Sequence, residues 1–350
     1  MTVARSQLVD VNVTRWYHTI SRCARRARLF GEGEATGQEG DRKAWIERRL
    51  QELDNIFAVS TGGFAVLDNH LHLLLRIDGD ASAQWSDEEV VRRWFKLYPP
   101  RGNDRQPLAA AKVDDLVGQR VQDVKWIAMT RGRLSSISWF MKCLKEPLSR
   151  MVNKQENCTG SFFEGRFKSI AILDDEALLS VAAYIDLNLV AAGIAATPEQ
   201  SPHTSVKARV DNAVAQDRLA DLQAAQHGSV AGSQAASQLE DSLWLIPIED
   251  RRQLDSSREG MLAGFTLGNY LLLVEHTGRL LREGKASISP ELAGIFERLG
   301  STAEAWQARM QRLGGGRLLG RFLASSRSAL RSAASKLGVH HLANLCGCSA

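Results

Sequence analysis

The segment Asp68–Leu75, with the sequence DNHLHLLL, constrains the fold most strongly because polar and apolar residues alternate within it. Alternation with a period of two is typical of a strand in a sheet with one buried face. His70 and His72 would then project from one side of the strand, and the leucines between and after them from the other. We therefore predict a strand here that carries two neighbouring imidazoles on one face of a sheet.

Patterns elsewhere in the first two thirds of the chain alternate between helix and strand. Gly62 and Gly63 are expected to mark a turn between two strands, and Pro147 should bend or break the helix that contains it. Asp174 and Asp175 stand where the N-cap of a helix belongs. The predicted elements are a strand at 11–22, a helix at 43–57, β structure at 58–77, a helix at 137–153, a strand at 162–173 and a helix that ends at Gly193.

Composition divides the chain into three units. Residues 1–209 form the main α+β unit, with a charged insertion at about 78–134. Residues 210–242, rich in Ala, Gln, Ser and Gly, predict a flexible linker. Residues 243–350 predict a small helical accessory domain, in which an arginine-rich helix at 317–337 has either an auxiliary DNA-binding role or an ordinary solvated face.

The overall composition permits many functions. The chain has 44% hydrophobic residues, 24% charged residues and a net charge of +4, which allows a nucleic-acid partner without requiring one. No apolar stretch approaches the roughly 20 residues of a membrane span, and the first residues lack the apolar core of a signal peptide. The five cysteines are scattered, so no disulfide framework is expected and a cytoplasmic location fits best.

Four side chains suggest chemistry at a metal ion. Two neutral imidazoles at the spacing of His70 and His72 can chelate one divalent ion, although a half-exposed strand without a ligand fits the same pattern. Tyr184 and Asn188 are four residues apart in a predicted helix and share one face. A phenol near a metal-bound phosphate can act as a covalent nucleophile, and the amide oxygen of Asn188 suits a hard cation. A core tyrosine with a hydrogen-bonded hydroxyl would give the same pattern.

Two cations lie in the strand predicted at 162–173. Arg166 and Lys168 would share one face of that strand, with Phe163 and Phe167 on the other face. Cationic groups beside aromatic rings suit a DNA backbone with unstacked bases. An ordinary solvated strand has the same composition, so both interpretations stay open.

Taken in order, four motifs resemble the single-tyrosine HUH transposases of the insertion-sequence type, and particularly the REP-associated tyrosine transposases. The resemblance covers about residues 10–205 without the insertion. It implies a ferredoxin-like antiparallel sheet of four or five strands with helices packed on it. The motifs are W-Y-H-T-I-S-R at 16–22, D-N-H-L-H-L-L-L at 68–75, G-R-F-K-S at 165–169 and Y-I-D-L-N-L-V-A-A-G at 184–193.

The resemblance also implies a function, which is DNA transposition. His70 and His72, with Asn188, would hold Mg²⁺ or Mn²⁺, and Tyr184 would cleave and rejoin single-stranded DNA through a 5′-phosphotyrosine. The DNA would carry a hairpin or a palindromic repeat beside the cut. The resemblance leaves open whether the chain acts as a monomer or as a homodimer.

The sequence departs from the family pattern at three positions. Asp68 stands where the family has proline, and Leu189 and Ala191 replace the proline and arginine of its N-P-V-R-A-G motif. The missing arginine removes a phosphate contact. Two alternatives therefore stay open: a non-catalytic, domesticated protein that binds hairpin or repeat DNA, and a nucleotide hydrolase of the histidine-triad type. The second would need a third histidine where this chain has Leu74.

Overall fold

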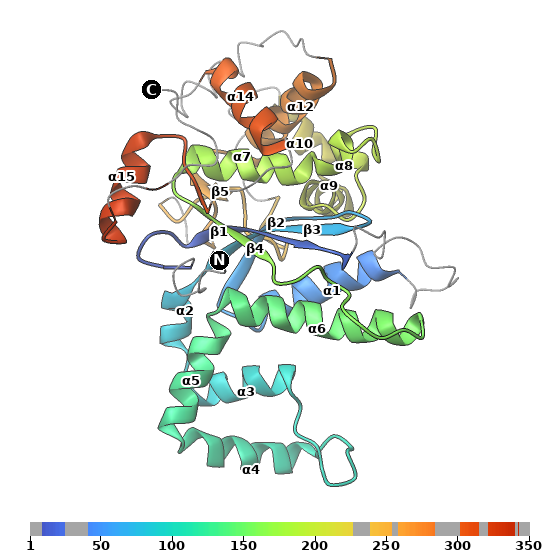
Figure 1. The fold of residues 1–350 in the computed structure, drawn as a ribbon, viewed down its shortest axis with the longest axis vertical. Helices are drawn as coiled ribbons and strands as arrows, with labels where there is room; N and C mark the ends of the chain where they lie inside the picture. Colours follow the sequence, from blue (N-terminus) through green and yellow to red (C-terminus); the bar gives the residue numbers. More distant parts are fainter. Residues whose placement is uncertain are drawn as a thin grey trace.

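The computed structural model of the chain describes residues 9–24, 41–226, 239–253, 258–283, 302–314, 321–339 and 342. Within these ranges a five-stranded sheet with the order β2-β3-β1-β4-β7 lies between layers of helices (Figure 1). The predicted α+β class is confirmed. The strands are β1 (Trp16–Arg22), β2 (Val59–Val66), β3 (His70–Ile77), β4 (Lys168–Ile172) and β7 (Phe322–Leu323).

Helices cover both faces of this sheet (Figure 1). The helices α1 (Arg42–Asp54) and α6 (Ile137–Gln155) pack on one face, where Tyr17 and Leu73 supply the apolar surface. On the other face, Ile20 and Leu74 join a second core formed with α7 (Asp175–Asp186), α12 (Leu267–Glu283) and α14 (Ala303–Gly314). Because both faces of the sheet are buried, alternate residues of each strand pack into two different cores.

The remaining elements surround this arrangement. In the described ranges no helix combines the length and the apolar character needed to cross a bilayer. The predicted insertion consists of helices that extend beyond the α6 face (Figure 1). The insertion holds α2 (Gly79–Gln84), α3 (Asp87–Leu97), α4 (Ala110–Val121) and α5 (Val124–Leu134). The other elements are α8 (Asn188–Ala191), η3 (Pro198–Gln200), α9 (Ser205–Ala215), α10 (Leu219–Gln226), β5 (Glu249–Asp250), β6 (Leu262–Ala263) and α15 (Arg327–Lys336).

The sheet is mixed, which corrects the expectation of a wholly antiparallel one. β1 pairs antiparallel with β3 and β4, and β2 pairs antiparallel with β3. β7, however, pairs parallel with β4. The pairing of β7 corrects a second prediction, because Phe322 and Leu323 fall inside the range expected to form one long helix from 317 to 337. The first residues of that range, through 320, lie outside the described residues.

Gly62 and Gly63 do not form the turn between β2 and β3 that we predicted. They lie within β2, where the register with β3 shifts. A Cβ atom on Gly62 would come within 2.9 Å of both Met261 Cε and Trp16 Cζ3. The turn itself lies at Asp68 and Asn69, just before His70. The two glycines therefore mark a bulge and a close approach of distant segments.

Pro147 does not break α6, which is helical from Ile137 to Gln155. Proline has no N–H to donate to the carbonyl four residues earlier, which belongs to Cys143. Arg49 Nε of α1 donates to that carbonyl oxygen at 3.3 Å. A hydrogen bond from the neighbouring helix thus replaces the one that Pro147 cannot make.

The segments after residue 200 belong to the main core. Where composition indicated a flexible linker from 210, α9 and α10 are helical up to Gln226, and residues 227–238 lie outside the described residues. Arg209 of α9 is buried, forms an ion pair with Glu240, and donates to Gly62 O at 2.8 Å and to Ile246 O at 3.0 Å. The C-terminal part therefore does not stand apart as a separate accessory domain.

Replacing Arg209 by Met should destabilise the whole fold. The change leaves Glu240 buried without its cation, which costs about 3–5 kcal/mol in the free energy of unfolding. The double variant Arg209→Met/Glu240→Gln should recover part of that loss. Urea unfolding followed by circular dichroism measures both. Lys207→Met, which removes a half-exposed cation from the same helix, serves as the control, and an equal effect of the two single variants would contradict the buried pair.

Asp54 should make stability depend on pH. It ends α1, accepts a hydrogen bond from Thr61 N at 2.6 Å, and burial raises its pKa from 3.8 to about 7. The folded state thus binds the proton more tightly than the unfolded chain, so stability falls as the pH rises from about 4 to 7. Because the residue is partly exposed, Asp54→Asn should gain only about 2 kcal/mol over the native chain across this range.

Urea unfolding at a series of pH values tests this expectation. The exposed Asp211→Asn is the control, and its difference from the native chain should stay flat. A difference for Asp54→Asn that does not change with pH would show that Asp54 titrates normally.

Candidate active site

Strand β3 brings the two predicted histidines together. The centroids of the His70 and His72 rings are 4.9 Å apart. In the antiparallel register with β1, His70 lies opposite Arg22 and His72 opposite Ile20. Directly paired residues project to the same side of a sheet, so these four side chains share one face. Ile20 belongs to the core formed with α7, and this face is therefore the one that α7 covers.

Helix α7 places the tyrosine over these histidines. The Asp174 side chain caps the helix by accepting a hydrogen bond from Ala177 N at 2.9 Å, as predicted for this position. The Tyr184 ring lies edge-on to the His72 ring, with 5.6 Å between centroids. One turn later, at the start of α8, the side chain of Asn188 lies close enough to both His70 and Tyr184 to influence the pKa of each. The four side chains that the sequence selected separately therefore converge on one site.

A third histidine, which we did not predict, completes this group. His18 Nε2 of β1 lies 2.8 Å from His72 Nδ1, and the two rings stack with centroids 5.1 Å apart. His18 is fully buried, and no described residue forms a hydrogen bond with its Nδ1. The sequence contains a pattern that could have indicated His18. His18, Ile20 and Arg22 occupy every second position of β1 and therefore share one face.

The hydrogen bonds indicate which nitrogen of each imidazole is available to a ligand. His70 Nδ1 lies 2.5 Å from Asn69 Oδ1, and His72 Nδ1 is engaged by His18. An amide oxygen accepts only, so the Nδ1 of His70 carries the proton and its Nε2 keeps the lone pair. The same arrangement at His72, with Nδ1 donating to His18, would leave its Nε2 lone pair available. A hydrogen-bond partner on the ring nitrogen that does not bind the metal is typical of metal-binding histidines.

Burial sets the protonation states at the site. It lowers the pKa of His70 to about 4 and that of His18 to about 3, and it holds the pKa of His72 well below its ordinary value. All three imidazoles are therefore neutral at pH 7, as metal coordination requires. Burial also raises the pKa of Tyr184, while the nearby amide of Asn188 and the charge of Arg22 lower it. The phenol stays protonated at neutral pH without a further cation.

The two cations predicted on one strand face occupy different places. β4 begins only at Lys168, because the chain loops out of register between Phe163 and Lys168. Lys168 is exposed and lies opposite Ile20, in the same cross-strand row as His72. Arg166 lies in the loop, so the prediction that these two cations share a strand face is wrong.

Arg166 instead borders an open groove on the α6 side of the sheet. Lys145 of α6 lies across this groove, with its Nζ 4.2 Å from the centre of the Phe163 ring and 2.9 Å from Gly165 O. The groove therefore combines cations with an aromatic ring, the composition expected of a surface for single-stranded DNA.

The histidine pair and Asn188 can supply a metal ion with two imidazole nitrogens and one amide oxygen. The residues described here contain no cluster of three or more His, Cys, Asp or Glu side chains that could hold a metal ion. The third protein ligand would accordingly be the oxygen of Asn188. The neutral histidines and their occupied Nδ1 atoms fit such an ion, because no hydrogen bond from the described residues engages the Nε2 of His70 or His72.

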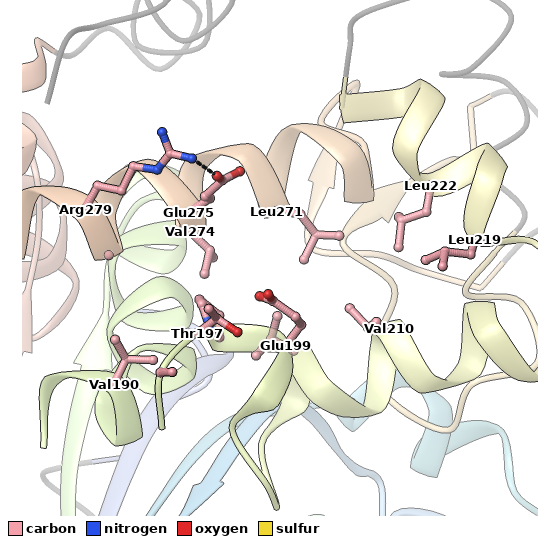
Figure 2. Close-up of a pocket in the computed structure, with 14 residues that line it drawn as sticks. Val190, Thr197, Glu199, Val210, Leu219, Leu222, Leu271, Val274, Glu275 and Arg279 are labelled. Carbon is pink, nitrogen blue, oxygen red and sulfur yellow. Dashed lines mark hydrogen bonds and ion pairs between the residues drawn. The ribbon is translucent and has the colours of Figure 1, made fainter. Parts of the chain in front are cut away.

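A separate cavity of about 430 Å³ lies between η3, α9, α10 and α12 (Figure 2). Its wall is mostly apolar, with Val210, Leu271 and Val274 among its residues, and the Glu275–Arg279 ion pair stands at its margin (Figure 2). It contains none of the histidines and not Tyr184. The residues that could perform chemistry therefore lie between α7 and the sheet and not in this cavity.

No family model, no curated protein and no solved structure matches the chain. The function must therefore be inferred from the four motifs and from the geometry of the site between α7 and the sheet.

His18 should control metal binding through His72. His18→Leu leaves His72 Nδ1 without its partner, and loss of such a partner typically weakens metal binding about 10–100-fold. His18→Gln, whose amide oxygen can accept the same hydrogen bond, should bind more tightly than His18→Leu. Titration with Mn²⁺ followed by electron paramagnetic resonance measures the affinity.

The control is His203→Ala, which removes a histidine that contacts Glu47 on the surface and should leave Mn²⁺ binding unchanged. Equal Mn²⁺ affinity of His18→Leu and the native chain would show that His18 does not position His72.

Proposed function

We propose that the chain is a metal-dependent transesterase of single-stranded DNA that cleaves and rejoins strands through Tyr184, as in DNA transposition. The observation that carries the proposal is Asn188, whose side chain lies close enough to both His70 and Tyr184 to influence the pKa of each. A candidate nucleophile and a candidate metal site thus share one polar residue. Such mutual geometry is the criterion for an active site, whereas each residue alone fits a structural role.

The chain topology supports the same proposal. The succession β1-α1-β2-β3, followed after the insertion by α6 and β4, is a β-α-β-β-α-β unit with the strand order β2-β3-β1-β4. This order supports the ferredoxin-like arrangement that the resemblance to single-tyrosine HUH transposases implies. α7 follows this unit directly and carries the tyrosine, as the order of the motifs requires.

His70 Nε2, His72 Nε2 and the amide oxygen of Asn188 would hold Mg²⁺ or Mn²⁺ in this proposal. When bound, such a cation neutralises charge on a phosphate and favours the ionised form of a nearby phenol. Asn188 is suited to a second task, because its NH₂ group could donate to the Tyr184 oxygen while its carbonyl oxygen binds the cation. It would thereby orient the phenol for attack.

Tyr184 would attack the scissile phosphorus in line with the leaving oxygen. The bond between Tyr184 Oη and phosphorus forms, the bond from phosphorus to the 3′-oxygen breaks, and the phenol proton ends on that oxygen as a 3′-OH. The phosphodiester is conserved as a 5′-phosphotyrosine, so a second 3′-OH can reverse the step and join new strands without a nucleotide cofactor.

The substrate in this proposal is single-stranded at the cut. Tyr184 is only partly exposed and faces the sheet, so a backbone must leave a duplex to reach it. Lys168, on the active-site face, and Arg166, beside the aromatic groove, would bind flanking phosphates. A neighbouring hairpin or palindromic repeat would be bound by its shape.

Tyr184→Phe should abolish covalent protein–DNA adducts. The substitution keeps the ring that packs near His72 and removes only the nucleophilic oxygen, so the loss should exceed about 1000-fold. Adducts are measured on denaturing gels after incubation of the chain with Mn²⁺ and a labelled pool of randomised single-stranded oligodeoxynucleotides. Tyr98→Phe, which alters a tyrosine exposed on the insertion, should leave the yield unchanged.

Adducts at native yield in Tyr184→Phe would refute the nucleophile. A native chain that binds hairpin DNA but forms no adduct with Mg²⁺ or Mn²⁺ would instead favour the non-catalytic DNA-binding alternative.

A further inference from the structure

Arg22 ends β1 beside the proposed metal ligands. It lies directly opposite His70 in the register of β1 with β3, and paired residues project to the same side of a sheet. Arg22 is half-buried, and its backbone oxygen accepts a hydrogen bond from Glu164 N at 3.0 Å. The guanidinium is therefore attached to a strand end that is fixed on both sides, on the face that carries His72 and Tyr184.

The guanidinium of Arg22 has no partner within the described part of the chain, because no hydrogen bond or ion pair joins it to another residue. The well-buried arginines of this protein behave differently. Arg76 pairs with Asp78, Arg209 with Glu240 and Arg309 with Glu176. A cation withdrawn from water without an anion is unfavourable. Since no described residue neutralises it, the guanidinium of Arg22 can receive an anion.

The charge of Arg22 acts directly on the site. It lowers the pKa of Tyr184 and those of His70 and His72, and no carboxylate contributes to these shifts. Lys168, a second cation of this face, is exposed and separated from His72 by Ile20 in the cross-strand row, and a third, Arg76, is held in an ion pair with Asp78. Among the described cations of this face, Arg22 is therefore the one whose charge acts on the reacting groups, and Lys168 lies at the margin of the site.

We propose that Arg22 binds the non-bridging oxygens of the scissile phosphodiester and holds the phosphorus beside Tyr184. This inference rests on the proposed function and assigns the residue that recognises its substrate anion. The planar guanidinium presents several N–H donors in a fixed geometry that matches two phosphate oxygens. Arg22 keeps its proton throughout, while the Tyr184–phosphorus bond forms and the bond to the 3′-oxygen breaks. Its hydrogen bonds stabilise the additional negative charge of the transition state.

Arg22→Ala should lower the rate of adduct formation on the randomised single-stranded pool on the order of 100-fold. Arg22→Lys keeps the charge without the paired donors and should give an intermediate rate. Guanidinium chloride added to Arg22→Ala should restore part of the rate, which it would not do if Arg22 only supported the fold. Arg101→Ala removes an equal charge from the exposed loop between α3 and α4 and should match the native chain. A native rate in Arg22→Ala would overturn the proposal.

A second measurement does not depend on catalysis. Phenylglyoxal modifies accessible arginines, and peptide mass spectrometry reports the extent at each one. In the native chain the single-stranded pool should slow modification of Arg22 at least several-fold, and it should leave Arg101 unaffected. Absence of protection at Arg22 would overturn the phosphate assignment. Protection at Arg22 together with no adducts would keep this anion site and refute the transesterase function.

Discussion

The buried carboxylate of Asp186 fixes the helix on which the whole site depends. Its oxygens accept hydrogen bonds from the hydroxyls of Ser205 and Tyr270, and from Val206 N at 2.9 Å. Asp186 stands two residues from Tyr184, which places the two side chains about 200° apart around the helix. Three donors on Asp186 therefore determine the rotation of α7 and direct Tyr184 to the histidines. Burial raises the pKa of Asp186, whereas these hydrogen bonds lower it and favour the carboxylate.

Segments from the last third of the chain also hold α7 in place. Tyr270 belongs to α12, and Arg309 of α14 forms a buried ion pair with Glu176 at the start of α7. The cap residue Asp174 also accepts a hydrogen bond from Ser325 N at 2.7 Å, just after β7. The helix with the candidate nucleophile is thus held at its beginning and its end by the C-terminal segments. Of these segments, α12 and α14 pack on the side of α7 away from the sheet, whereas β7 extends the sheet itself (Figure 1).

The local periodicity of the sequence predicted most helices and strands, whereas the way in which they pack together depends on long-range contacts. The alternation at 68–75 correctly placed His70 and His72 on one face, and the four-residue spacing correctly joined Tyr184 to Asn188. His18 and Arg22 were missed because their role depends on which strand lies beside β3, and no local period contains that pairing. Gly62 fits a turn as well as a bulge, and only the approach of Trp16 and Met261 distinguishes them. The metal, the DNA substrate and the transposase resemblance remain predictions from the motifs.

The charge balance of the site connects the two proposals. The three proposed ligands are neutral, since burial keeps both imidazoles uncharged and the third is the amide of Asn188. They would leave the charge of a bound divalent cation uncompensated, and Arg22 adds a further positive charge that no carboxylate of the described residues pairs with. An assembly with this excess of positive charge in a partly buried position is stabilised when an anion completes it. A phosphodiester would serve as that anion, so the cation and the DNA backbone should each strengthen the binding of the other.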